Sequence, residues 1–267
     1  MKKIIFILAP VITIGLFVYY FLPKLNSPAV ETKEIFIGNA KMDVEIADTS
    51  EKMARGLSGR DYVTENNGML FVYNEPGIYS FWMKDMKFPL DIIWIEANGK
   101  IADITKSALP ESYPKSFTSK EPAKYVIETS SGWCDKNNIK IGDATAILYE
   151  YETKIKAKED LIKVKNPEIG ETILSPLAVE GEARGNWFFE ASFPVKLFDS
   201  NGNELAVKAA TASNAASWMT TEFVPFSVSL EFTPPKETDI GFLVLKKDNP
   251  SGLPEHDDEI QIPIRFR

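Results

Sequence analysis

Apolar residues recur at every second position over long stretches of the second half of the chain, and this period constrains the fold most. The alternation runs through residues 187–197, 226–232 and 260–266. A period of two places one face of a β-strand in a core and the other face in water. About seven such strands within roughly 105 residues predict an immunoglobulin-like β-sandwich, which we assign to residues 161–267.

The preceding region, residues 33–150, combines short strands with a short helix. Residues 48–51 read Asp-Thr-Ser-Glu, a pattern typical of a helix N-terminus, and we expect the helix to continue through Met53 and Leu57. Residues 90–95 are almost all apolar, which predicts a strand that is buried on both faces. The sequence therefore predicts a small, β-rich, barrel-like α+β domain.

Charged residues dominate the stretch between these two regions. Residues 151–168 contain few apolar side chains and end near a proline. Such composition is typical of an inter-domain linker or an exposed edge strand. We expect a linker at residues 151–160.

The N-terminus carries a long apolar run. Residues 4–22 are uncharged and follow two lysines. As a helix this run would be about 28 Å long, close to the thickness of a bilayer. It predicts an uncleaved signal-anchor in residues 1–30, in preference to a cleaved signal peptide or a buried core helix. The lysines then favour a cytoplasmic N-terminus, with residues 31–267 outside the membrane.

Composition excludes several classes of function. The formal net charge is −8, and the chain has one cysteine and one histidine. Nucleic-acid binding normally needs a basic surface, so we expect no nucleic-acid partner. A single cysteine and a single histidine argue against most metal sites and most histidine-based catalysis. We therefore expect no metal and no cofactor.

The segment from Phe81 to Asp91 contains the best candidate site. It places Trp82, Lys84 and Asp91 among apolar residues. A buried Asp91 would cost several kcal/mol unless paired. Two interpretations remain open for these residues: a structural ion pair of Asp91 with Arg55, Arg60 or Lys84, or a pocket for a polar ligand. The candidate ligand-binding residues are Arg55, Arg60, Trp82, Lys84 and Asp91.

Two families share motifs with this chain. Residues 55–60 (Arg-Gly-Leu-Ser-Gly-Arg), 68–71, 81–84, 89–93 and 142–143 stand in the order and spacing of uncharacterised protein family 127. The first domain thus resembles that family, which is also called domain of unknown function 192. The resemblance implies a compact, barrel-like β-rich domain without an established activity.

The second domain resembles the immunoglobulin-like domain of bacterial spore germination. The resemblance rests on Ser175-Pro176, residues 179–183, 187–190 and 199–202, Trp218 and residues 262–264. It implies an extracytoplasmic interaction domain.

These observations predict a membrane-anchored envelope protein that binds or scaffolds. Its partners would be the membrane, through residues 4–22, and an envelope protein or saccharide. The alternative is that the first domain is an enzyme or a sensor for an envelope saccharide or peptide. No Gly-x-Ser-x-Gly motif occurs, and the single histidine lies in the other domain, so the sequence favours binding.

Overall fold

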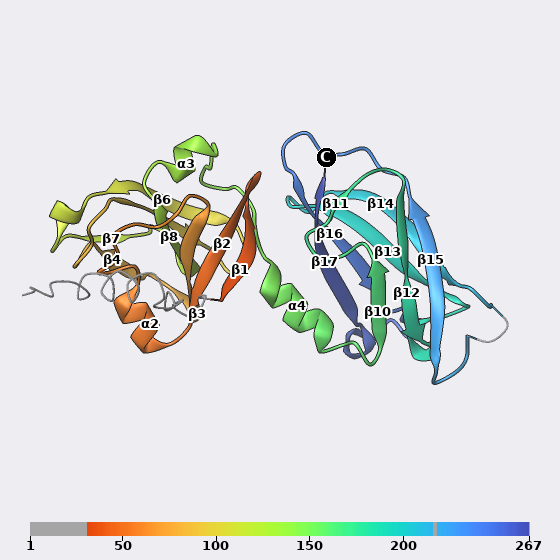
Figure 1. The fold of residues 1–267 in the computed structure, drawn as a ribbon. Helices are drawn as coiled ribbons and strands as arrows, with labels where there is room; N and C mark the ends of the chain where they lie inside the picture. Colours follow the sequence, from red (N-terminus) through yellow and green to blue (C-terminus); the bar gives the residue numbers. More distant parts are fainter. Residues whose placement is uncertain (1–30, 216–217, 267) are drawn as a thin grey trace, which may run out of the picture. The chain divides into compact units, whose positions relative to one another are not determined.

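Two curled β-sheets form the framework of the described residues in the computed structural model (Figure 1). The structure describes residues 31–215 and 218–266. The first sheet is formed by residues 32–147 and the second by residues 162–266. Both predicted regions are thus β-rich.

The first sheet has seven strands. Their order across the sheet is β6-β5-β8-β3-β2-β1-β9; β2 and β3 are parallel, and the other neighbours are antiparallel. The bounds are β1 (Thr32–Ile37), β2 (Ala40–Ala47), β3 (Asn67–Gly77), β5 (Leu90–Ile95), β6 (Ile101–Ala108), β8 (Ala123–Ser130) and β9 (Thr145–Ile147).

Both faces of this sheet are covered by apolar clusters. One face, here called the Phe71 face, carries Phe71 and Trp94. The opposite face, here called the Ile127 face, carries Ile127 and Ile93. All six residues of β5 are buried, which confirms the prediction of a strand buried on both sides. Adjacent residues of one strand therefore enter different cores.

Short elements connect these strands. They are α2 (Ser50–Arg55), β4 (Ser80–Trp82), η1 (Pro110–Ser112), β7 (Ser116–Thr118), α3 (Trp133–Lys136) and α4 (Leu148–Lys156), and β4 pairs with β7 in a separate two-stranded sheet. The Thr49 hydroxyl accepts a 3.3 Å hydrogen bond from the N–H of Lys52 and caps α2. The helix ends before Leu57 because Gly56 adopts a φ of +52°, a conformation that side chains disfavour.

The second sheet has eight strands. Their order is β10-β12-β15-β14-β13-β16-β17-β11, in which only β11 and β17 are parallel neighbours. The bounds are β10 (Ile162–Asn166), β11 (Thr172–Ile173), β12 (Leu177–Arg184), β13 (Ser192–Asp199), β14 (Glu204–Ala212), β15 (Phe223–Leu230), β16 (Ile240–Lys246) and β17 (Glu259–Phe266), with η2 (Gly185–Trp187) and η3 (Pro254–His256) between strands.

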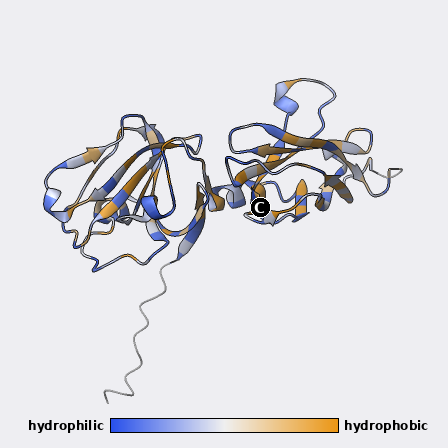
Figure 2. Ribbon diagram, turned by 90° about the horizontal axis from the view of Figure 1, so that it is seen from above, coloured by the Kyte–Doolittle hydropathy of each residue, from blue (hydrophilic) through white to orange (hydrophobic). Residues whose placement is uncertain are grey.

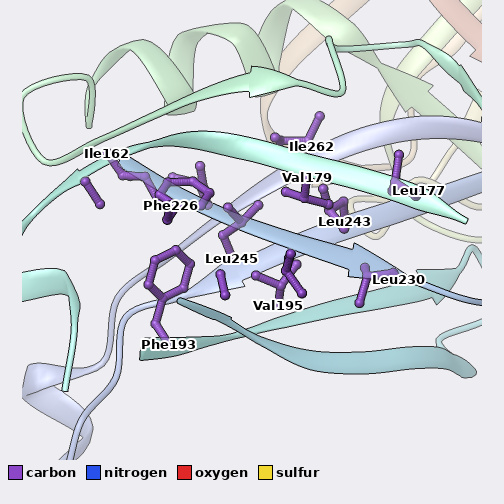
Figure 3. Packing of buried hydrophobic residues seen from close by; sticks show 14 of the residues in the cluster. Ile162, Leu177, Val179, Phe193, Val195, Phe226, Leu230, Leu243, Leu245 and Ile262 are labelled. Atoms are coloured by element: carbon purple, nitrogen blue, oxygen red, sulfur yellow. The ribbon is translucent and has the colours of Figure 1, made fainter. Parts of the chain in front are cut away.

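The inner faces of these strands form one apolar core, as Figure 3 shows. The rings of Phe193 and Phe226 pack edge to face at 4.9 Å between centroids. The alternation confirms the predicted inward faces of β13 and β15. It fails at Phe189, which is 41% exposed, because positive φ angles at Glu190 and Ala191 interrupt the extended backbone before β13. Figure 2 shows apolar residues interspersed with polar ones along the strands.

The predicted transmembrane helix is not supported. Residues 4–22 lie outside the described residues, and within residues 31–215 and 218–266 no helix has the length and apolar character needed to cross a bilayer. The fold class is therefore corrected: the described residues form two β-rich regions, and the transmembrane helix is no longer part of it. The predicted localisation, a membrane anchor with residues 31–267 extracytoplasmic, rested on that helix and is withdrawn with it.

The charged stretch between the sheets contains regular structure. Helix α4 extends to Lys156, and β10 begins at Ile162. Strand β9 ends at Ile147, and the helix begins at the next residue, Leu148. The division into two independently folding domains stays a prediction.

Gly181 of β12 provides a test of the second core. A Cβ atom at this position would lie 2.2 Å from the carbonyl oxygen of Lys163 and 2.6 Å from Cζ of Phe226. We expect Gly181→Ala to lower the free energy of unfolding by roughly 3 kcal/mol, since overpacking moves backbone as well as side chains. Urea unfolding measures this.

The matched control is Gly202→Asn. Gly202 has a φ of +84°, and a Cβ atom at this position would have no neighbour within 4 Å; asparagine tolerates that backbone conformation. The control should change the free energy of unfolding by less than about 1 kcal/mol. Equal effects of the two substitutions would contradict the packing of Phe226 on Gly181.

Candidate functional site

A buried carboxyl group, Glu128, lies on the Phe71 face of the first sheet. It belongs to β8, where it pairs with Met69 of β3 on one side and Ile92 of β5 on the other. Its exposed fraction is 5%. Because β8 has a hydrogen-bonded neighbour on each side, this side chain cannot reach solvent around a sheet edge.

A small cavity of about 70 Å³ adjoins this carboxyl group. The residues that line it come from α2 and the loop after it, from β3, from β4 and the turn after it, and from β8. They are Met53, Ala54, Arg55, Gly56, Leu57, Ser58, Phe71, Tyr73, Ser80, Phe81, Trp82, Met86 and Glu128.

Glu128 is only partly satisfied by hydrogen bonds. The backbone N–H of Leu57 donates to the carboxyl group. Oxygen Oε2 is buried and has no hydrogen-bond partner among the residues that the structure describes. Burial raises the pKa of Glu128 from 4.5 to about 7, and the bond from Leu57 and the charge of Arg60 oppose this rise.

Aromatic rings form much of the cavity wall. Phe71 and Phe81 pack edge to face at 4.8 Å between centroids. Tyr73 is stacked on Tyr79 at 3.4 Å, with 8° between the ring planes. These contacts fix the rings in place, so the cavity has a firm apolar wall beside the carboxyl group.

Trp82 extends the aromatic surface outward. It lines the cavity, yet its exposed fraction is 52%. Its ring contacts that of Tyr113 at 5.9 Å between centroids, with 71° between the planes, and Tyr113 is 46% exposed. Two partly exposed aromatic rings therefore lie next to the cavity.

The loop after α2 is held close to Glu128. A Cβ atom on Gly56 would lie 3.1 Å from Oε2 of Glu128, so glycine allows this approach. The Ser58 hydroxyl donates to the carbonyl of Lys84 at 2.9 Å, and the N–H of Gly59 donates to the carbonyl of Asp85 at 2.9 Å. These two bonds attach the loop to the turn that follows β4.

Arg60 lies near Glu128 but is engaged elsewhere. Its guanidinium group donates two hydrogen bonds to the carboxylate of Glu45, at 2.5 and 2.7 Å. This bidentate pair raises the pKa of Arg60. The positive charge of Arg60 is thus largely balanced by Glu45.

The structure brings together some of the residues singled out from the sequence. Arg55 and Trp82 line the Glu128 cavity, and Arg60 interacts with Glu128 through its charge. Lys84 contributes its backbone carbonyl to the loop contact, and its side chain is exposed. Asp91 does not belong to this site.

Asp91 lies on the other face of the sheet. It pairs with Thr129, one position from Glu128 in register, and so points toward the Ile127 face. Its two oxygens accept hydrogen bonds from the N–H groups of Ser107 and Cys134, both at 2.9 Å. Backbone donors therefore bind Asp91 where one of the two interpretations from the sequence placed an ion pair with Arg55, Arg60 or Lys84. Burial, together with Asp91, raises the pKa of the Cys134 thiol.

Sequence reasoning missed Glu128. A signal was present, because Glu128, like Asp91, is an acidic residue that adjoins the apolar run of a strand. The sequence could not show that β8 lies in the interior of the sheet, where a charge is buried. That placement follows from pairing with distant strands.

No metal centre is apparent in the described residues. Within residues 31–215 and 218–266, no group of three or more His, Cys, Asp or Glu side chains could hold a metal ion. The carboxylate of Asp199, in the second sheet, accepts bonds from the N–H groups of Asn201 and Asn203 and from the Asn203 side chain. It closes a hairpin turn.

The pKa of Glu128 predicts a pH-dependent stability. The folded protein binds the carboxyl proton of Glu128 more tightly than the unfolded chain does, since the pKa of Glu128 is about 7 in the folded state and 4.5 in the unfolded chain. The stabilising contribution is therefore full below pH 4.5 and is lost as the pH rises through 7. The loss amounts to about 3 kcal/mol, at roughly 1.4 kcal/mol per pKa unit. Glu128→Gln removes this dependence.

Urea unfolding at a series of pH values tests this. The free energy of unfolding of Glu128→Gln, relative to the original protein, should rise by about 3 kcal/mol between pH 4.5 and pH 8. Glu121→Gln, at an exposed position, is the control and should show no such trend. Parallel pH profiles for all three proteins would mean that Glu128 ionises normally.

Asp91 should contribute to stability through its hydrogen bonds. Asp91→Ala leaves two N–H groups, of Ser107 and Cys134, without their acceptor in a buried setting. We expect it to lower the free energy of unfolding by about 2–5 kcal/mol at pH 7. Asp91→Asn keeps one acceptor oxygen and should cost less. A loss below about 1 kcal/mol for Asp91→Ala would contradict a structural role.

Two family models match separate parts of the chain. The family DUF192, described as "Uncharacterized ACR", matches residues 33–147. The family Gmad2, described as the immunoglobulin-like domain of bacterial spore germination, matches residues 161–252. A search of curated proteins gives no match.

Two solved structures are similar in sequence. One is a protein from Sinorhizobium meliloti 1021, provisionally described as a transcription regulator; it is 28% identical over 44% of this chain and 94% of its own, with a TM-score of 0.42. The other is a protein of unknown function from Novosphingobium aromaticivorans DSM 12444; it is 26% identical over 45% of this chain and 89% of its own, with a TM-score of 0.43. The chain contains a region that matches the DUF192 family, in which the Glu128 cavity lies, followed by a region that matches the immunoglobulin-like domain of bacterial spore germination.

Proposed function

We propose that the first domain is a binding module for a saccharide, with the Glu128 cavity and the Trp82–Tyr113 pair as its site. The observation that carries the proposal is the buried oxygen Oε2 of Glu128, which adjoins a cavity and has no partner among the described residues. An unpaired buried acceptor is costly. A ligand that donates a hydrogen bond to it would recover part of that cost.

The volume of the cavity limits what enters it. About 70 Å³ is the space of roughly two water molecules at about 30 Å³ each. A sugar ring is too large, but one substituent of a ring fits. The ring itself would then lie outside, against the exposed face of Trp82.

The exposed aromatic pair suits such a ring. The rings of Trp82 and Tyr113 contact each other and are 52% and 46% exposed, and Trp82 also lines the cavity. The C–H faces of a pyranose can pack on aromatic rings while its hydroxyl groups stay hydrated. Trp and Tyr are common in binding sites of this kind because each side chain combines an apolar ring with a polar group that stays hydrated.

The enzyme alternative has less support. Glycoside hydrolysis normally uses two carboxyl groups on opposite sides of the scissile bond. Glu128 is the one carboxyl group among the residues that line the cavity. A pKa of about 7 suits a general acid or base, but the second group is not among those lining residues. Binding is therefore the better interpretation.

The second domain acts as a scaffold in this proposal. Its buried carboxylate, Asp199, is satisfied by three donors, and its apolar side chains fill a single core. Neither feature offers an acceptor comparable to Oε2 of Glu128.

A saccharide screen with the full chain tests the proposal. Isothermal titration calorimetry at pH 7 with di- and tetrasaccharides built from glucose, glucosamine and N-acetylglucosamine should identify at least one ligand. Trp82→Ala removes the stacking surface, and Glu128→Gln removes the acceptor charge. Each should weaken binding at least tenfold, which corresponds to about 1.4 kcal/mol, without loss of the folded state.

Tyr62→Ala is the matched control, because Tyr62 is an exposed aromatic residue of the same domain, 70% exposed, and does not line the cavity. It should bind like the original protein. The proposal fails if no saccharide binds, or if the Trp82 and Glu128 variants bind as well as the control.

A further inference from the structure

The nearest positive charges do not neutralise Glu128. The guanidinium group of Arg60 donates its hydrogen bonds to Glu45, and Arg55 is exposed, where water and salt screen its charge. Tyr73, which faces Glu128 from β3, has a pKa raised to about 12 and stays neutral. The cavity therefore has an uncompensated acceptor at its inner end.

The aromatic walls favour a positive group. Rings of Phe71, Tyr73, Phe81 and Trp82 are among the residues that line the cavity beside Glu128. The face of an aromatic ring carries negative charge density and attracts a cation, by up to about 2 kcal/mol when water is excluded. A carboxylate among aromatic rings therefore suits a small cation better than a neutral hydroxyl group.

An ammonium group also matches the cavity in size and hydrogen bonding. It has three donors and no acceptor, so it can bond to Oε2 without placing a second acceptor against the carboxylate. An acetylated amine is larger and carries a carbonyl oxygen, which the carboxylate would repel. A cavity of about 70 Å³ therefore accepts an ammonium group more readily than an acetylated amine.

We propose that the saccharide recognised by this domain is an amino sugar with a free, protonated amine, which enters the cavity and pairs with Oε2 of Glu128. This inference rests on the proposed saccharide-binding function and adds the chemical class of the ligand. The sugar ring stacks on Trp82, and the ammonium group supplies the partner that the described residues do not give to Glu128.

Calorimetry with two matched sugars tests the inference. The full chain is titrated at pH 6 with the disaccharide of glucosamine and with the disaccharide of N-acetylglucosamine. The free amine should bind at least tenfold more tightly. Each titration is repeated in a second buffer with a different ionisation enthalpy, which reveals proton release. The glucosamine disaccharide should release about one proton, since Glu128 is mostly protonated at pH 6 before binding.

Two variants separate the contributions. Glu128→Gln should abolish both the preference for the amine and the proton release. Trp82→Ala should weaken both sugars by the same factor and leave the preference intact, because it removes stacking and not the acceptor.

The outcomes distinguish this inference from the proposed function. Equal or tighter binding of the acetylated sugar overturns the amine preference, yet leaves saccharide binding in place. If Glu128→Gln binds the free amine as tightly as the original protein does, the proposed pairing of the amine with Glu128 is also overturned. If neither these two sugars nor any other saccharide binds, the inference and the proposed function fall together.

Discussion

The burial of one carboxyl group on an interior strand is the constraint on which the candidate site depends. Strand β8 lies between β3 and β5, so Glu128 can reach solvent only through the layer that covers the Phe71 face. That layer leaves a small cavity at this point. The loop from Gly56 to Arg60 approaches the carboxyl group, donates one hydrogen bond to it and leaves the other oxygen free. Stability alone would favour an apolar residue here.

Two buried carboxyl groups in one sheet show how architecture and function differ. Asp91 has a backbone donor for each oxygen and connects β5 to Ser107 of β6 and to Cys134 of α3. Glu128 has one donor for two oxygens. A fully satisfied group stabilises the fold, whereas a group left unsatisfied beside a cavity is available to a ligand. Register places these two side chains on opposite faces, although their positions in the sheet are adjacent.

Local sequence patterns predicted much of the fold, whereas the position of the candidate site depends on pairing between strands that are distant in the sequence. Residues 90–95 indicate a doubly buried strand, and the alternation in 226–232 indicates an inward face, because both depend on neighbouring residues alone. Arg55 and Trp82 were identified within motifs, and both line the cavity. Glu128 was missed because its burial depends on β3 and β5, which lie far away in the sequence. The membrane helix was wrongly included in the fold class because an apolar run was its sole support.

The pH titration of the Glu128 side chain tests the central claim most directly. Carboxyl ¹³C chemical shifts of the full chain with labelled glutamate would be followed from pH 3 to pH 9, and Glu128→Gln identifies the resonance by its loss. We expect this resonance to titrate near pH 7, well above exposed glutamates near about 4.3. Titration of Glu128 at an ordinary glutamate pKa would mean that the carboxyl group is solvated or paired, and it would contradict the assignment of the site.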